Sequence, residues 1–271
     1  MTFTPRQSRG TNQTGCFRRA GAARQSGVSF QERMETNMRV FLDSADQKLV
    51  AEWLEQGVVD GVTTNPSIIW KDGVADLEQG ARSLAALLGD RPLCVEVTSN
   101  DHATMLDEAR QFASWTRNIV VKIPVVNEYG ESCLGVMHRL SQEGVAINAT
   151  AILSFNQAIL AAKAGATYVS IFAGRVADEG NDATVLIRNV RRWLDDWEFS
   201  TRIIVGSIRT VMDIQNAALA GAHVITIPPQ FLPKMVDHRY SRETVRQFVQ
   251  DAEKTLNQMS KAKVRVATPG D

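Results

Sequence analysis

The segment VAINATAILSFNQAILAAKAGATYVSIFAG, residues 145–174, decides the fold. Residues 145–154 are rich in Val, Ile and Thr, as β-strands are, and so are residues 168–174. Between them, SFNQAILAAKAG places apolar residues at helical intervals and ends in Gly165, as many helices end in glycine. The segment is therefore predicted to be a strand–helix–strand unit.

The same unit recurs from residue 39 to residue 228. Strand-like runs occupy residues 39–44, 61–65, 93–99, 119–124, 145–154, 168–174, 202–208 and 223–228. Helical patterns such as ADQKLVAEWLEQG separate them, and several end in a glycine, namely Gly57, Gly144, Gly165 and Gly221. Because the strands are apolar nearly throughout, both their faces are expected to be buried, as in parallel sheets.

Eight strand–helix units in one chain predict an α/β fold, a closed (β/α)₈ TIM barrel. An open, doubly wound sheet is the alternative, and the lack of a GxGxxG motif after the first strand disfavours it. We expect a single barrel domain over residues 39–258, which includes a C-terminal helix, followed by a flexible tail over 259–271.

Residues 1–38 differ in composition from the rest of the chain. They contain six arginines but only Glu32 and Glu35 as acids, and few large apolar residues. We expect a disordered basic extension, because such a segment buries too little apolar surface to offset the entropy of ordering. It is either an upstream extension before a start at Met34 or Met38, which we favour, or an organelle transit peptide.

The overall composition excludes several classes of protein. Thirty basic residues balance 30 acidic ones, so no positive field favours binding to nucleic acid. No apolar run approaches the roughly 20 residues of a membrane-spanning helix. The cysteines, Cys16, Cys94 and Cys133, and the four histidines form no metal-binding pattern. We therefore expect a cytoplasmic protein without a metal site.

Polar residues interrupt the apolar strands near their carboxyl ends, where barrels of this kind carry their chemistry. Seven of the eight strands contribute to the set, which comprises Asp43, Thr63, Thr64, Asn65, Glu96, Lys122, Asn148, Thr150, Ser170, Arg175, Ser207 and Arg209. Buried polar groups must satisfy one another or meet a ligand, so these residues are candidates for a site.

Lys122 stands alone among the apolar residues of IVVKIP, 119–124. Burial disfavours the charged form of an amine, and the neutral amine is the form that attacks a carbonyl carbon. Lys122 is therefore a candidate Schiff-base nucleophile. The alternative is a structural ion pair with Glu96 or Asp43, and the spacing alone does not choose between them.

The other candidates also have structural alternatives. One of Glu96 and Asp43 can act as a general base, directly or through a water, or both can balance the charge of Lys122. Asp43 can instead cap the helix that begins near residue 45. Asn148 and Thr150 are two residues apart on one strand, so their side chains are expected to point to the same face, inward together. They can fix a water or a substrate hydroxyl, or they can form hydrogen bonds with neighbouring strand ends. Asn65 lies in a turn that leads into a helix.

Arg175, Ser207 and Arg209 follow the sixth and seventh predicted strands. Loops after the late strands of such barrels commonly bind phosphate, and guanidinium groups suit a phosphate dianion. We favour a phosphate site over the alternative of two surface arginines.

Seven motifs resemble the transaldolase family, in particular its short subgroup that includes the fructose-6-phosphate aldolases. In order, they are FLDSAD, DGVTTNPSII, VEVTSND, VVKIP, INATAILSFNQAIL, AGATYVSIFAGR and VGSIRT, within about residues 39–255. The resemblance implies a class I aldolase barrel, with Lys122 on the fourth strand as the Schiff-base lysine and neither a metal nor an organic cofactor.

The resemblance also implies a role for each matching residue. Asp43 matches the general acid/base aspartate, and Glu96 and Thr150 match the pair that positions a catalytic water. The residues that match the donor-binding positions are Thr63, Asn65, Asn148, Ser170 and Phe172, and those that match the phosphate site are Arg175, Ser207 and Arg209. The implied partners are sugar phosphates and further copies of the chain, as a homo-oligomer such as a decamer of two pentameric rings.

The resemblance favours transaldolase activity over aldolase activity. The aldolase subgroup carries Gln and Tyr at the positions of Glu96 and Phe172, whereas transaldolases carry Glu and Phe there and Ser at the position of Ser170. The expected reaction transfers a dihydroxyacetone unit from fructose 6-phosphate or sedoheptulose 7-phosphate to an aldose phosphate. The alternatives are an aldolase that releases free dihydroxyacetone, a transaldolase of specialised sugar synthesis, and a catalytically silent scaffold that binds sugar phosphates.

Overall fold

The computed structural model describes the backbone of residues 37–267 and the side chains of residues 37–260. The predicted basic extension lies outside the described residues except for positions 37 and 38, and so does the end of the predicted tail from residue 268 onward. Both remain predictions.

Eight parallel strands close into a barrel in chain order. They are β1 (Arg39–Asp43), β2 (Gly61–Thr63), β3 (Leu93–Glu96), β4 (Ile119–Pro124), β5 (Ile147–Ile152), β6 (Tyr168–Phe172), β7 (Arg202–Gly206) and β8 (Val224–Ile227). The pairing of β1 with β8, which sets Arg39 opposite Val224, closes the sheet. The predicted (β/α)₈ barrel is confirmed, and the open sheet is excluded.

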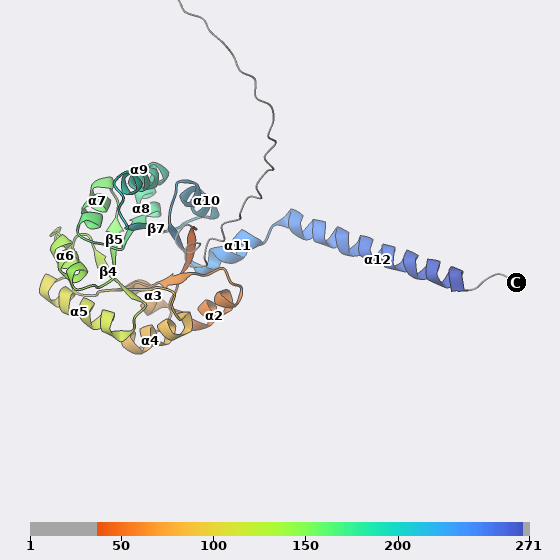
Figure 1. Ribbon diagram of the computed structural model, residues 1–271, viewed down its shortest axis with the longest axis horizontal. Helices are drawn as coiled ribbons and strands as arrows, with labels where there is room; N and C mark the ends of the chain where they lie inside the picture. Colours follow the sequence, from red (N-terminus) through yellow and green to blue (C-terminus); the bar gives the residue numbers. More distant parts are fainter. Residues whose placement is uncertain (1–36, 268–271) are drawn as a thin grey trace, which may run out of the picture. The chain divides into compact units, whose positions relative to one another are not determined.

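Helices surround the strands (Figure 1). They are α2 (Gln47–Glu55), α3 (Pro66–Lys71), α4 (Leu77–Leu88), α5 (His102–Trp115), α6 (Leu134–Gln142), α7 (Phe155–Lys163), α8 (Ala173–Asp178), α9 (Ala183–Asp196) and α10 (Val211–Leu219). After β8 follow the 3₁₀ turn η1 (Pro229–Phe231), α11 (Leu232–Val236) and α12 (Arg239–Ala267).

Local sequence signals begin and end these helices. Seven begin after a side chain that accepts a backbone N–H bond, from Asp46, Asn65, Asp76, Asp101, Ser154, Asp182 and Thr210. Such caps satisfy amides that the first helical turn leaves without a partner. The four glycines predicted to end helices all adopt positive φ, the conformation that glycine tolerates best.

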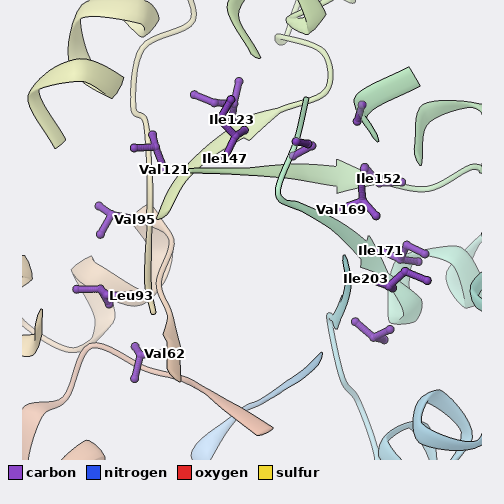
Figure 2. Close-up of a cluster of buried hydrophobic side chains, with 14 of the residues drawn as sticks. Val62, Leu93, Val95, Val121, Ile123, Ile147, Ile152, Val169, Ile171 and Ile203 are labelled. Atoms are coloured by element: carbon purple, nitrogen blue, oxygen red, sulfur yellow. The ribbon is translucent and has the colours of Figure 1, made fainter. Parts of the chain in front are cut away.

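The main apolar core lies between the strands and the helices. Alternate strand residues enter it, and Figure 2 shows this layer, for example Val95 of β3, Val121 of β4 and Ile171 of β6. Burial of each such side chain stabilises the fold by about 1.5–3 kcal/mol. Because side chains alternate along a strand, the intervening residues face the barrel interior.

The barrel interior has an apolar floor. A separate cluster of buried side chains forms it, consisting of Phe41, Cys94, Val120, Tyr168, Ile204 and Val224. Two residues further along their strands stand Asp43, Glu96, Lys122, Ser170 and Thr226. The interior therefore changes from apolar to polar within one layer of side chains, towards the carboxyl ends of the strands.

Helix α12 continues to Ala267, so it includes residues 259–267, which the sequence predicted to belong to a flexible tail. Its described apolar side chains are exposed, among them Val245, Phe248 and Leu256. No helix in residues 37–267 is both long enough and apolar enough to cross a membrane.

Replacement of Gly61 tests the packing of the floor. A Cβ atom on Gly61 would lie 2.7 Å from the ring of buried Phe41, and such overpacking costs about 1–3 kcal/mol. We predict that Gly61→Ala lowers the melting temperature by about 2–10 °C, measured by thermal unfolding. Gly135→Ala in α6, where a Cβ atom meets nothing within 4 Å, is the control and should not lower it. Equal melting temperatures for the two variants would contradict this packing.

Candidate active site

The polar layer above the floor is made of side chains from seven strands, namely Asp43, Thr63, Glu96, Lys122, Asn148, Thr150, Ser170 and Thr226. Strand register places Asp43 beside Thr63, Glu96 beside Lys122, and Lys122 beside Asn148. The sequence-predicted residues of the first six strands therefore share one end of the barrel interior, where parallel strands direct their carboxyl ends.

Lys122 is buried, with 5% of its surface exposed. Its Nζ lies 2.8 Å from Oε2 of Glu96 and donates a hydrogen bond of 2.7 Å to the carbonyl oxygen of Thr64. The ion pair with Glu96 that the sequence allowed is thus present. No ion pair joins Lys122 to Asp43 among the described residues. A buried amine without these partners would be costly, so Glu96 and Thr64 hold the amine in place.

Asp43 accepts a 2.6 Å hydrogen bond from Oγ1 of Thr63. The same hydroxyl oxygen lies within hydrogen-bond distance of Oγ1 of Thr226. Burial raises the pKa of Asp43, against the lowering effects of the Thr63 hydrogen bond and the charge of Lys122. The interpretation of Asp43 as a helix cap is wrong, because Asp46 caps α2.

Two buried polar atoms of β5 have no hydrogen-bond partner among the described residues: Nδ2 of Asn148 and Oγ1 of Thr150. Oδ1 of Asn148 accepts a 2.8 Å bond from Oγ of Ser170. Orphaned polar atoms in a barrel interior are costly unless a ligand or water meets them. Beside them, Ala151 adopts a φ of 58°, and the pairing of β5 with β6 shifts there. Bulges and backbone strain of this kind cluster at functional sites.

The remaining donor-site candidates lie at the rim. Oδ1 of Asn65 accepts a hydrogen bond from Ile68 N and so caps α3. Phe172 ends β6, and the Arg175 guanidinium lies 5.8 Å from the centre of its ring.

The start of α8, which directly follows β6, contacts the loop after β7. The amide of Gly174 donates a 3.1 Å hydrogen bond to the carbonyl oxygen of Ser207, whose φ is 58°. A Cβ atom at Gly174 would lie 2.2 Å from that oxygen, so only glycine permits this approach. Arg209 forms a 2.6 Å ion pair with Asp178 of α8. The predicted phosphate residues are therefore neighbours in the fold, and Arg209 already has a carboxylate partner.

Sequence reasoning missed several residues of this end of the barrel. It assigned no polar residue to the eighth strand, yet Thr226 contacts Thr63. The signal was available, because Thr226 stands two residues after Val224 and so shares its inward parity. Asp178, by contrast, ends α8 and Asp72 directly follows α3, and no local pattern marks either residue.

The chemistry open to the site follows from the side chains that line it. Within residues 37–260, no three His, Cys, Asp or Glu side chains gather closely enough to hold a metal ion. The arrangement instead offers one buried lysine, two carboxylates and a row of hydroxyl and amide groups. A primary amine with an adjacent base is the arrangement that forms an imine with a ketone.

Comparisons with known proteins show the family to which the chain belongs. Residues 40–268 match the family model described as transaldolase/fructose-6-phosphate aldolase. A protein of Dehalococcoides mccartyi named "Probable transaldolase" is 39% identical over 79% of this chain and 97% of its own length. "Probable transaldolase 2" of Listeria monocytogenes is 40% identical over 80% and 96%, and "Probable transaldolase" of Streptococcus pyogenes is 41% identical over 79% and 97%. The chain is therefore an enzyme of the transaldolase/fructose-6-phosphate aldolase family.

Proposed function

We propose that the protein is a transaldolase that acts through a Schiff base on Lys122. It transfers a dihydroxyacetone unit from a ketose phosphate, fructose 6-phosphate or sedoheptulose 7-phosphate, to an aldose phosphate. The observation that carries the proposal is the buried Lys122 amine, 2.8 Å from the Glu96 carboxylate. A carboxylate at this distance can take up the proton that the amine must lose before it attacks.

Cleavage begins at the ketose carbonyl. The neutral amine of Lys122 adds to C2, and the C2 oxygen then leaves as water with the proton that Glu96 took from the amine, which gives a protonated imine. Asp43 removes the proton of the C4 hydroxyl, the C3–C4 bond breaks, and its electrons enter the imine. An aldose phosphate leaves, and a dihydroxyacetone enamine stays on Lys122. The imine is the electron sink, so the residues present suffice for this step.

Transfer reverses these steps on a second aldose phosphate. The enamine carbon attacks the acceptor aldehyde, and the new hydroxyl oxygen receives the proton held by Asp43. Water then hydrolyses the imine and frees the ketose and the amine. We assign the positioning of this water to Glu96 and Thr150, and contacts to the three-carbon unit to Thr63, Asn65, Asn148, Ser170 and Phe172. The partnerless polar atoms of Asn148 and Thr150 support this assignment.

The alternative within the family is an aldolase that releases free dihydroxyacetone. The family description includes that activity, so it is the second candidate. The names of the relatives and the presence of Glu96 and Phe172 favour transfer. A carboxylate beside the amine can hold the water molecule that leaves when the imine forms and that returns when the imine is hydrolysed.

We assign the substrate phosphate to Arg175, Ser207 and Arg209. The contact between α8, which carries Arg175, and the loop after β7, which carries Ser207 and Arg209, supports this assignment. A phosphate bound there aligns the sugar chain. The binding energy of the phosphate, far from the reacting carbon, then orients the C2 carbonyl towards Lys122.

We also propose that the chain forms a homo-oligomer through α12. The exposed apolar side chains Val245, Phe248, Val249, Leu256 and Met259 support this, because their spacing gathers them along one side of the helix. Sedimentation of the full chain as a monomer would contradict it.

Trapping by borohydride tests the nucleophile. We predict that reduction in the presence of fructose 6-phosphate adds a three-carbon adduct to Lys122, located by peptide mass spectrometry. Lys122→Met should abolish both the adduct and turnover, because no described lysine other than Lys122 lies in the polar layer. Lys163→Met, at the exposed end of α7, is the control and should retain both. An adduct on another lysine of an active preparation would refute the assignment.

Replacement of Arg209 separates phosphate binding from imine chemistry. A lost charged hydrogen bond costs about 1.5–2 kcal/mol, so Arg209→Ala should raise the KM for fructose 6-phosphate by about 10- to 30-fold. Trapping of unphosphorylated dihydroxyacetone on Lys122 should hardly change, because this molecule has no phosphate group for Arg209 to bind. Arg192→Ala removes a matched exposed arginine–aspartate pair and should leave both unchanged. Equal losses of turnover and of dihydroxyacetone trapping in Arg209→Ala would show that Arg209 is structural.

A further inference from the structure

A carboxylate outside the polar layer holds the segment that directly follows Asp43. Oδ2 of Asp72 accepts two hydrogen bonds, one of 2.9 Å from Oγ of Ser44 and one of 2.8 Å from the amide of Ala45. Ser44 is 1% exposed, and its Oγ in turn accepts a bond from the amide of Asp46. One oxygen of Asp72 thus fixes both residues that follow Asp43.

We propose that Asp72 is a positioning residue for Asp43, acting through Ser44 and Ala45. The inference rests on the proposed function, in which Asp43 exchanges a proton with the substrate C4 hydroxyl.

The path of the chain explains why Asp72 can do this. Helix α3 begins directly after Asn65, which follows the strand that carries Thr63, and Asp72 is the residue at its C-terminal cap. Thr63 bonds the Asp43 carboxylate directly, and Asp72 bonds the two residues after it. The end of β1 is therefore held at two points by one short segment, which fixes the position of the carboxylate relative to Lys122. A misplacement of about 1 Å is enough to slow a reaction by about 100-fold.

Asp72 also acts on Asp43 through its charge. Asp43, Ser44 and Asp72 all line one groove of about 560 Å³. The groups that act on Asp43 are Thr63 of β2, Glu96 of β3, Lys122 of β4 and Asp72 beyond α3. Burial raises the pKa of Asp43 most; Thr63 and Lys122 lower it, and the negative charges of Glu96 and Asp72 raise it further. Removal of the Asp72 charge must therefore lower the pKa of Asp43.

Two substitutions separate the hydrogen bonds from the charge. Both bonds end on the same oxygen, so the amide oxygen of Asp72→Asn can accept both while the charge is lost. Asp72→Ala removes the bonds and the charge together. The matched control is Asp60, whose Oδ2 accepts a 2.9 Å bond from the amide of Val40 at the opposite end of β1.

The experiment measures kcat, KM, trapping of dihydroxyacetone on Lys122, and the pH dependence of turnover of fructose 6-phosphate in the full chain. We predict that Asp72→Ala lowers kcat by about 10- to 100-fold, with KM and trapping changed by less than about threefold. Asp72→Asn should keep kcat within about threefold at its optimum pH. Because turnover needs ionised Asp43 and is lost as pH falls through its pKa, the acid limb of this variant should move to lower pH. Asp60→Ala and Asp60→Asn should change neither kcat nor the acid limb.

The outcomes that overturn the inference are distinct from failure of the proposed function. A folded Asp72→Ala enzyme with the kcat of Asp60→Ala overturns it. If Asp72→Ala does not fold, Ser44→Ala decides, because it removes one of the two hydrogen bonds to Asp72, and an unchanged kcat in that variant overturns the inference. Asp43→Asn is made in parallel. Full turnover by that variant shows instead that the proposed role of Asp43 is wrong.

Discussion

The ion pair between Lys122 and Glu96 is the interaction on which the site depends. It places an amine and a carboxylate 2.8 Å apart inside the barrel, with the Thr64 carbonyl as a second acceptor for the amine. Taking both charges out of water is costly, so the surrounding structure must fix their geometry. Strand register does this, because Glu96 and Lys122 are direct neighbours on β3 and β4. The pair therefore follows from the closed parallel sheet.

The apolar floor and the polar layer both follow from the alternation of side chains between the two faces of each strand. Val120 and Lys122 face the same interior two residues apart, and Cys94 and Glu96 do so on the adjacent strand. The floor supplies packing that holds the strands in register, and the layer above it supplies the chemistry. Burial raises the pKa of Asp43, which suits the role of base that we propose for it, and the same burial makes its charged form costly.

Much of the fold and several site residues were predictable from the sequence, because the alternation of side chains in strands and the spacing of apolar residues in helices are local patterns. They gave the eight strands, the lysine within IVVKIP and the inward parity of Asn148 and Thr150. Contacts between distant segments were not predictable. Asp72 meets Ser44 and Asp178 meets Arg209 only after the helices have packed, and the choice of Asp46 over Asp43 as a helix cap depends on where α2 begins. The sequence prediction omitted Thr226, although its place two residues after Val224 indicates an inward-facing side chain.

Transfer of labelled carbon tests the central claim most directly. Fructose 6-phosphate labelled with ¹³C at C1, C2 and C3 is incubated with the protein and erythrose 4-phosphate, and the products are followed by mass spectrometry. The account predicts that all three labelled carbons appear together in sedoheptulose 7-phosphate, that little free dihydroxyacetone forms, and that Lys122→Met shows no transfer. Labelled free dihydroxyacetone as the main product, or transfer that persists in Lys122→Met, would contradict it.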